Sequence, residues 1–211
     1  MNLKRFERKT KNDKWKNTKI SNYTHLNKNY CLKNQVVLIG DSITDFYNYY
    51  ELFDTFTQKT GLKIYNRGIS GDTSNRLLER LYDNALIIEP SKLVCLIGTN
   101  DIALGADIEY ISENIRSVIL QTKKHCPECK IAIQSVYPVI DHRKRHNRDI
   151  KKLNALIRTV CEQEKVLYID LFDNLCDEKG QFDNAYTYDG LHPNIFGYEI
   201  STKAITEFLN E

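Results

Sequence analysis

The sequence lacks any long hydrophobic run. No apolar stretch in its 211 residues approaches the roughly 18–20 residues that a membrane-spanning helix needs. The basic N-terminus is also not followed by the apolar segment that a secretory signal contains. We therefore expect a cytoplasmic protein with no integral membrane segment.

Acidic residues are scarce in the first 35 positions, where two stand against ten lysines and arginines and leave a net charge of +8. The rest of the chain carries twenty basic and twenty-six acidic groups, a net charge of −6. A basic segment can contact an anionic surface, but dispersed lysines and asparagines are more typical of a solvated extension. Trp15, Tyr23 and Tyr30 leave open that the segment packs on the domain. We expect no nucleic-acid partner.

The size and composition indicate one ordinary globular domain. A chain of 211 residues with 41% hydrophobic and 27% charged residues can bury one substantial core and is short for two. Six cysteines in a chain without a visible secretory signal predict reduced thiols. Cys95 lies within an apolar run, and we expect it in the core.

From residue 36 onward, short apolar runs alternate with longer amphipathic stretches. The expected strands, which are apolar on both faces, are residues 36–39, 63–65, 93–97, 131–136 and 166–169. The expected helices are residues 47–60, 74–84, 108–124, 148–163 and 195–210. This alternation predicts a doubly wound α/β fold with a parallel sheet. We interpret residues 1–35 as a basic N-terminal extension and residues 36–211 as the domain.

Chemically suggestive motifs follow the first three expected strands. They are Gly-Asp-Ser at 40–42, Asn-Arg-Gly at 66–68 and Gly-Thr-Asn-Asp at 98–101. In an open α/β sheet, functional residues collect at the carboxyl ends of the strands. With Asp189 and His192 near the C-terminus, we expect four segments to converge on one edge of the sheet.

Ser42, His192 and Asp189 are the residue types that acyl transfer requires. A serine hydroxyl needs a base to take its proton, and a histidine needs an acceptor to hold its tautomer. Asp189 and His192 are close enough in sequence to share one loop. Candidate donors to an oxyanion are the backbone N–H groups of Ser42 and Gly71 and the side-chain amide of Asn100. The expected chemistry is ester cleavage through a covalent acyl-serine.

These motifs resemble the four sequence blocks of the SGNH, or GDSL, hydrolases, and the likeness covers nearly all of residues 36–211. The matching segments are Gly-Asp-Ser-Ile at 40–43, Asn-Arg-Gly-Ile-Ser-Gly-Asp-Thr at 66–73, Gly-Thr-Asn-Asp at 98–101 and Asp-Gly-Leu-His-Pro at 189–193. The resemblance implies a flavodoxin-like, three-layer α/β/α sandwich around a five-stranded parallel sheet. It also implies catalytic roles for Ser42, Gly71, Asn100 and His192, with Asp189 completing the triad.

Two other kinds of functional site, a nucleophile elbow and a zinc finger, are excluded. The nucleophile elbow of α/β-hydrolases needs Gly-x-Ser-x-Gly, but Thr44 stands at its last position. Cys126, Cys129, His142 and His146 have the spacing of a zinc finger. An expected strand lies between the two pairs and holds them roughly 23 Å apart, so we expect no metal site. No organic cofactor is implied either.

The sequence motifs indicate the reaction mechanism more closely than they indicate the substrate. The glycine block is similar to that of the branch with platelet-activating-factor acetylhydrolase subunits and carbohydrate acetylesterases, which favours acetyl esters of a carbohydrate. The alternatives are a lysophospholipase or thioesterase for longer chains, and a non-catalytic carbohydrate-binding relative. Asp41, Tyr137 and Tyr188 are candidate substrate contacts, although such tyrosines also pack loops. His142 and His146 either line a cationic cleft rim or begin a solvated helix, and the oligomeric state is not predicted.

Overall fold

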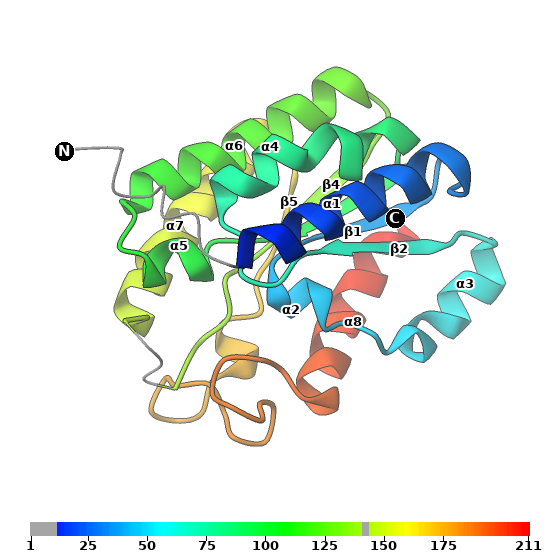
Figure 1. Cartoon of the computed structure of the whole chain (residues 1–211). Helices are drawn as coiled ribbons and strands as arrows, with labels where there is room; N and C mark the ends of the chain where they lie inside the picture. The colour runs from blue at the N-terminus through cyan, green and yellow to red at the C-terminus, as the bar shows by residue number, and fades with distance from the viewer. Residues whose placement is uncertain (1–11, 141–143) are drawn as a thin grey trace.

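A computed structural model describes residues 12–140 and 144–211 of the chain. Its centre is a five-stranded sheet in the order β2-β1-β3-β4-β5, in which every pair is parallel (Figure 1). The strands are β1 (Val36–Gly40), β2 (Ile64–Gly68), β3 (Lys92–Leu96), β4 (Lys130–Gln134) and β5 (Leu167–Ile169). The expected five parallel strands are therefore confirmed.

Helices cover both faces of this sheet. The helices of eight or more residues are α1 (Asn12–Asn29), α4 (Ser74–Asn84), α6 (Ile108–His125), α7 (Asn147–Glu164) and α8 (Ile195–Asn210). The short ones are α2 (Ser42–Asp45), η2 (Tyr50–Phe53), α3 (Asp54–Thr60), η3 (Leu86–Ile88), α5 (Thr99–Ala103) and η4 (Asp173–Leu175). Among the described residues, no helix is both long and apolar enough to cross a membrane.

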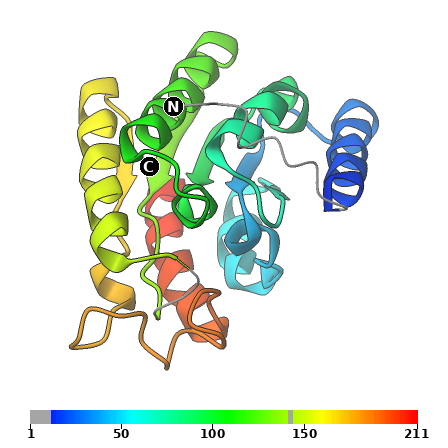
Figure 2. The same ribbon diagram turned by 60° about the vertical axis from the view of Figure 1, so that its left-hand side comes forward.

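The alternation of side chains along β1 divides the core into two halves. Val37 and Ile39 pack with the apolar faces of α4, α6 and α7, whereas Val36 and Leu38 pack with α3 and α8. Figure 2 shows these two groups of helices on opposite sides of the sheet. All four strand residues are at most 2% exposed, because each face of a parallel sheet is covered. The result is the expected three-layer α/β/α sandwich.

The strand order changes direction at β1, which pairs with β2 on one side and with β3 on the other. The loops after β1 and β3 therefore diverge to opposite faces of the sheet at its carboxyl edge. Ligands of open α/β sheets bind at such switch points. The segment that follows β1 begins at Asp41 and Ser42.

Local structure departs from the sequence prediction at two places. Residues 66–68 complete β2 instead of following it, because the backbone pairing with β1 continues to Gly68. Residues 47–60, expected as one helix, form η2 and α3 after an irregular start. The other expected helices lie within one residue of their observed bounds, and α4 and α8 match at both ends. A side-chain cap begins each of these two, from Thr73 and Asn194 respectively.

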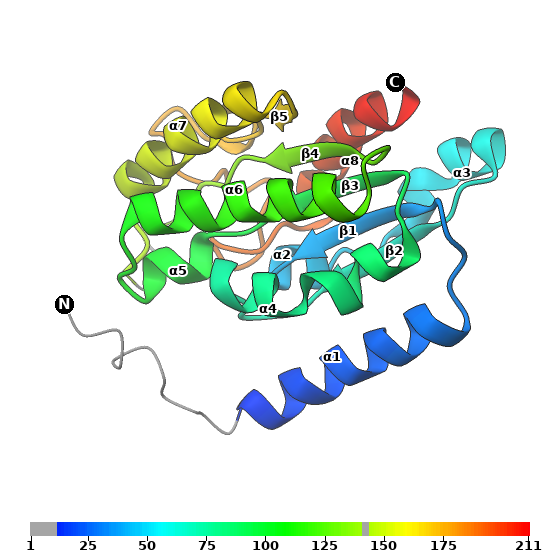
Figure 3. The same ribbon diagram turned by 90° about the horizontal axis from the view of Figure 1, so that it is seen from above.

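The N-terminal segment forms a packed helix over residues 12–29. Helix α1 lies along α4, beside the β2 edge of the sheet (Figure 3). Its contacts are largely polar: Asn27 donates to the Asp83 carbonyl (3.0 Å), and Asn84 donates to the Ile20 carbonyl (3.2 Å). The segment is thus held to the domain and is not the solvated extension that its composition favoured. Of the three aromatic residues that left packing open, Tyr23 contacts the domain, whereas Trp15 and Tyr30 are exposed.

Candidate active site

Ser42 is the first residue of α2 and lies just beyond the carboxyl end of β1. Asp41 caps this short helix, because its Oδ1 accepts a hydrogen bond from the Ile43 N–H (3.0 Å). The Tyr198 hydroxyl donates to the Ile43 carbonyl (2.8 Å) and joins the same turn to α8. The Ser42 backbone is fixed from both sides, and the residue is 7% exposed.

The structure brings Ser42, His192 and Asp189 into one hydrogen-bonded chain. Ser42 Oγ lies 2.9 Å from His192 Nε2, and His192 Nδ1 lies 2.7 Å from Asp189 Oδ2. Both distances are within hydrogen-bonding range, and the serine and the histidine are 150 positions apart in the sequence. This geometry allows the imidazole to take the serine proton while the carboxylate holds the ring.

The loop before α8 holds the Asp189 carboxylate in its charged form. Its Oδ1 accepts hydrogen bonds from the backbone N–H groups of Leu191 (3.0 Å) and His192 (2.7 Å). Burial alone would raise the pKa of Asp189, but these N–H groups and the His192 ring outweigh it and keep the pKa below its usual value. Asp189 therefore remains an acceptor for the imidazole at neutral pH.

A tight turn over residues 69–72, the glycine turn, lies beside the serine. The Asp72 N–H donates to the Ile69 carbonyl (3.0 Å), and Gly71 has a φ of +74°, which a residue without Cβ adopts at no steric cost. In the described part of the chain, neither the Gly71 N–H nor the Ser42 N–H has a hydrogen-bond acceptor. Both backbone donors are therefore available to a bound group.

Asn100 lies in α5, directly after β3, and its amide orientation is fixed by two partners. Its Nδ2 donates to the Asp72 carbonyl (2.9 Å), and its Oδ1 accepts from Arg145 Nη2 (2.8 Å). Arg145 Nε also donates to the carbonyl and hydroxyl oxygens of Thr99 (3.1 Å each). The second Nδ2 hydrogen of Asn100 is thereby left for another acceptor.

Arg145 is a residue of the site that the sequence analysis did not select. Its side chain is buried at 7% exposed and bonds to Asn100. No local motif marks it, because the segment between β4 and α7 carries several similar basic residues. His146 is exposed at the start of α7, and His142 lies outside the described residues.

Two of the three expected substrate contacts are buried. Asp41 is fully buried beneath the serine as a helix cap, and burial raises its pKa to about 7. Tyr137 is 3% exposed, and its hydroxyl contacts Gln134 and Ser201 inside the core. Asp41 is held as the cap of α2, and Tyr137 is held against α8 through Ser201.

Tyr188, the third expected substrate contact, is exposed beside His192. It is 62% exposed, and its ring stacks on the His192 ring with centroids 6.1 Å apart. Phe46, which the sequence analysis did not select, is 40% exposed, and its ring lies 5.1 Å from the same imidazole. Two exposed aromatic rings therefore flank the histidine.

The cysteine pair with zinc-finger spacing and His146 stand on opposite sides of β4 in the chain. Cys126 and Cys129 precede the amino end of β4, whereas His146 follows its carboxyl end at the start of α7. Burial raises the pKa of the Cys129 thiol to about 12, which disfavours the thiolate that binds a metal. Within residues 12–140 and 144–211, no group of three potential metal ligands is found.

Similar proteins carry the same domain. The sequence profile of the GDSL-like lipase/acylhydrolase family matches residues 38–200. An acetylxylan esterase from Geobacillus stearothermophilus is 25% identical over 166 residues, 72% of each protein. An N-acylneuraminate cytidylyltransferase from Escherichia coli O18:K1:H7 is 31% identical over 179 residues, which are 82% of this chain but only 40% of that protein.

Solved structures agree with the sequence matches. A Streptococcus pneumonia protein named for platelet activating factor superimposes with a TM-score of 0.82 at 30% identity, covering 93% of this chain and 95% of its own. The family profile spans the strands and loops that carry Ser42, the glycine turn and Asn100, and it extends into α8. The chain therefore belongs to the GDSL-like lipase/acylhydrolase family and is a carboxylic ester hydrolase.

Proposed function

We propose that this protein is a serine esterase that removes short acyl groups, acetyl above all, from a carbohydrate. The observation that carries the mechanism is the hydrogen-bonded chain from Ser42 Oγ through His192 to Asp189, with heavy-atom distances of 2.9 and 2.7 Å. A serine in such contact with a neutral imidazole is activated for attack on an ester carbonyl.

In the proposed mechanism, His192 takes the Ser42 proton as Oγ attacks the carbonyl carbon. The negative charge that develops on the carbonyl oxygen is received by the N–H groups of Ser42 and Gly71 and by the Asn100 amide. His192 then protonates the departing alcohol and leaves an acyl-serine. A water molecule, deprotonated by the same imidazole, hydrolyses that intermediate and restores the serine.

The proposed leaving-group position lies beside His192, because this residue protonates the alcohol. Phe46 and Tyr188 flank the imidazole with exposed rings, and an exposed aromatic face packs well against the C–H face of a sugar ring. The E. coli relative is named for N-acylneuraminate and the Geobacillus relative for acetylxylan, and both are acyl-bearing carbohydrates. Cytidylyl transfer is not carried over, since 60% of that protein lies outside the match.

Two cavities in the described part of the chain lie away from the serine. Their volumes are about 320 and 210 Å³, their lining is mainly charged and polar, and neither contains Ser42 or His192. A lysophospholipase or long-chain thioesterase needs an apolar channel that begins at the serine, and neither of these two cavities supplies one. The preference for a short acyl group is supported by the similarity to the acetylxylan esterase.

Hydrolysis of p-nitrophenyl acetate, butyrate and octanoate tests the proposal, beside acetate release from acetylated sugars. We expect the highest kcat/KM with acetate and no turnover by the Ser42→Ala variant. A maximum at octanoate would overturn the short-chain assignment, and activity in Ser42→Ala would overturn the nucleophile assignment. Tyr188→Ala should raise the KM for the sugar ester without a matching change for p-nitrophenyl acetate, with Tyr82→Ala on α4 as the exposed control.

A further inference from the structure

Helix α1 reaches the glycine turn with a buried lysine. Lys16 is 8% exposed, and its Nζ donates a hydrogen bond to the Gly71 carbonyl at 2.5 Å. Lysine is among the side chains least often buried, because its ammonium group loses hydration. A helix that needed only to pack here would carry an apolar residue, so the ammonium group at this position indicates a specific partner.

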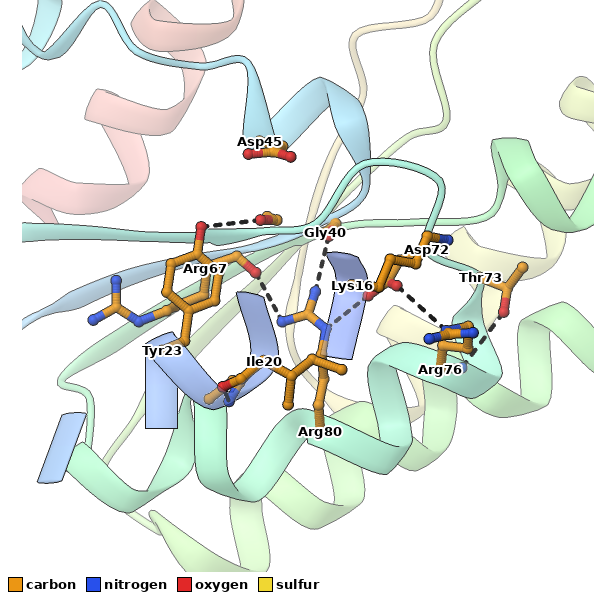
Figure 4. A network of polar contacts seen from close by, with 12 residues as sticks. Lys16, Ile20, Tyr23, Gly40, Asp45, Arg67, Asp72, Thr73, Arg76 and Arg80 are labelled. Carbon is orange, nitrogen blue, oxygen red and sulfur yellow. Dashed lines mark hydrogen bonds and ion pairs between the residues drawn. The ribbon is translucent and has the colours of Figure 1, made fainter. Parts of the chain in front are cut away.

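Two residues on one face of α1 contact the chain from Gly68 to Gly71, and a third contacts Asp45. Lys16, Lys19 and Tyr23 are spaced i, i+3 and i+7 and so share a face of the helix. The Tyr23 hydroxyl donates to the Gly68 carbonyl (3.2 Å), and Lys19 forms an ion pair with Asp45. Figure 4 shows Lys16 and Tyr23 turned toward this segment from α1.

Asp45, the ion-pair partner of Lys19, also contacts the glycine turn. Its Oδ2 accepts hydrogen bonds from the Ser70 backbone N–H (2.9 Å) and from the Ser70 hydroxyl (2.7 Å). Asp45 is the last residue of α2, the helix that begins with Ser42. Lys19 thus neutralises a carboxylate that joins the nucleophile helix to the turn.

The peptide that carries the Gly71 N–H lies between these two attachments. Ser70 is held on one side through Asp45, and the Gly71 carbonyl is held on the other by Lys16. Glycine at a positive φ has no side chain to restrict it, and its backbone loses more freedom on ordering than that of other residues. External contacts must therefore fix the direction of this N–H.

We propose that Lys16 is a positioning residue for the oxyanion donor Gly71, and that α1 is consequently part of the catalytic architecture. This inference rests on the esterase mechanism proposed above. Oxyanion donors act through preorganisation, and a displacement of about 1 Å costs on the order of 100-fold in rate. Lys16 touches no substrate atom, so its loss should affect the chemical step and leave substrate binding nearly intact.

The test compares kcat and KM for p-nitrophenyl acetate in Lys16→Met, Lys16→Arg and Lys14→Met, each measured well below its melting temperature. We expect Lys16→Met to lower kcat about 10- to 100-fold with KM changed less than about twofold. Lys16→Arg should recover part of the loss, because it restores a cationic donor. Lys14→Met removes an exposed charge two residues away and should match the wild type.

A double-mutant cycle separates positioning from a general loss of stability. If Lys16 acts through Gly71, Lys16→Met should cost little more in a Gly71→Ala background, whereas independent effects would multiply. An unchanged kcat in Lys16→Met, or effects that multiply fully in the cycle, would overturn the inference about Lys16. The esterase proposal would still stand if the wild-type protein hydrolyses the ester and Ser42→Ala does not. A wild type that hydrolyses no ester would overturn both.

Discussion

Replacing Asp41 with asparagine is expected to stabilise the protein at pH 8 and to change its stability little near pH 4. The Asp41 side chain is 0% exposed. Its Oδ1 accepts from the Ile43 N–H, but its Oδ2 has no hydrogen-bond partner among the described residues. Burial, opposed by the Ile43 N–H and assisted by the charges of Asp72 and Asp101, raises the pKa of Asp41 to about 7.

The sign of the pH dependence follows from this raised pKa. In the unfolded chain Asp41 ionises near its ordinary value of 3.8, whereas in the folded protein it keeps its proton up to about pH 7. Between these values the native state binds more protons than the unfolded state, so the free energy of unfolding falls as the pH rises. Above about pH 7 this contribution is constant.

The pKa of Asp41 differs by about three units between the folded and unfolded states. At 1.36 kcal/mol per unit, the loss of unfolding free energy is on the order of 4 kcal/mol. Asparagine retains an Oδ1 acceptor for the cap and has no proton to lose. The free energy of unfolding of Asp41→Asn therefore does not contain this pH-dependent decrease. The stability of Asp41→Asn relative to the wild type should therefore increase by on the order of 3–4 kcal/mol between pH 4 and pH 8. The titrations of Asp72 and Asp101 occur in both proteins and largely cancel in the difference.

Urea unfolding of both proteins at several pH values between 4 and 8 measures this difference, provided that the slope m stays equal. Asp83→Asn on α4 removes an exposed carboxyl and serves as the control, for which we expect no comparable trend. A stability difference between Asp41→Asn and the wild type that is constant over this range would refute the reasoning. It would mean that Asp41 is ionised in the native state.

Three further predictions concern the site. Asp189→Asn should lower kcat for p-nitrophenyl acetate about 10⁴-fold, because the amide stabilises the wrong tautomer of His192; activity within tenfold of wild type would contradict this. Arg145→Lys should lower kcat about tenfold at nearly constant KM, since a lysine cannot hold Asn100 and Thr99 together, and an unchanged kcat would exclude this role. Gly68→Ala should destabilise the protein by about 3 kcal/mol and lower its Tm, because the added Cβ would collide with the α2 backbone; an unaltered Tm would speak against it.

The fold and the meeting of the candidate catalytic residues could be predicted because each depends on a local signal. Strands such as β1 are apolar on both faces, which is typical of a parallel sheet covered by helices. Once the strands are parallel, their carboxyl ends must share one edge. Ser42 and Asn100 follow two neighbouring strands, and their proximity to one another requires no knowledge of side-chain contacts.

The burial of Tyr137 could not be predicted, because position relative to a strand does not determine side-chain direction. Tyr137 follows β4 at the functional edge, but its ring turns into the core between the sheet and α8. The partner that receives its hydroxyl, Ser201, is 64 residues away and belongs to a helix whose rotation is set by other contacts. An exposed and a buried tyrosine therefore look alike in the sequence at this edge.

Helix α1 escaped prediction for a different reason. Its attachment uses polar atoms, as in the hydrogen bonds from Arg67 to the Asn27 side chain (2.7 and 3.1 Å) and from Asn84 to the Thr24 hydroxyl (3.0 Å). Hydrophobic periodicity detects only helices that bury an apolar stripe. A helix bound through lysine, asparagine and tyrosine has the composition of a solvated segment, and its contacts become visible only with the partner surface in place.

Acidic residues near the candidate catalytic residues connect the segments that carry them. Asp45 of the nucleophile segment accepts two hydrogen bonds from Ser70 of the glycine turn. Asp101, next to Asn100, accepts from the Ser74 backbone N–H and hydroxyl at the start of α4. Hydrogen bonds to charged, shielded carboxylates are stronger than neutral ones. Donors that must receive an oxyanion without rearranging need such fixed supports. The segments around Ser42 and Asn100 therefore each supply one group for the proposed reaction and one carboxylate that holds a neighbouring segment in place.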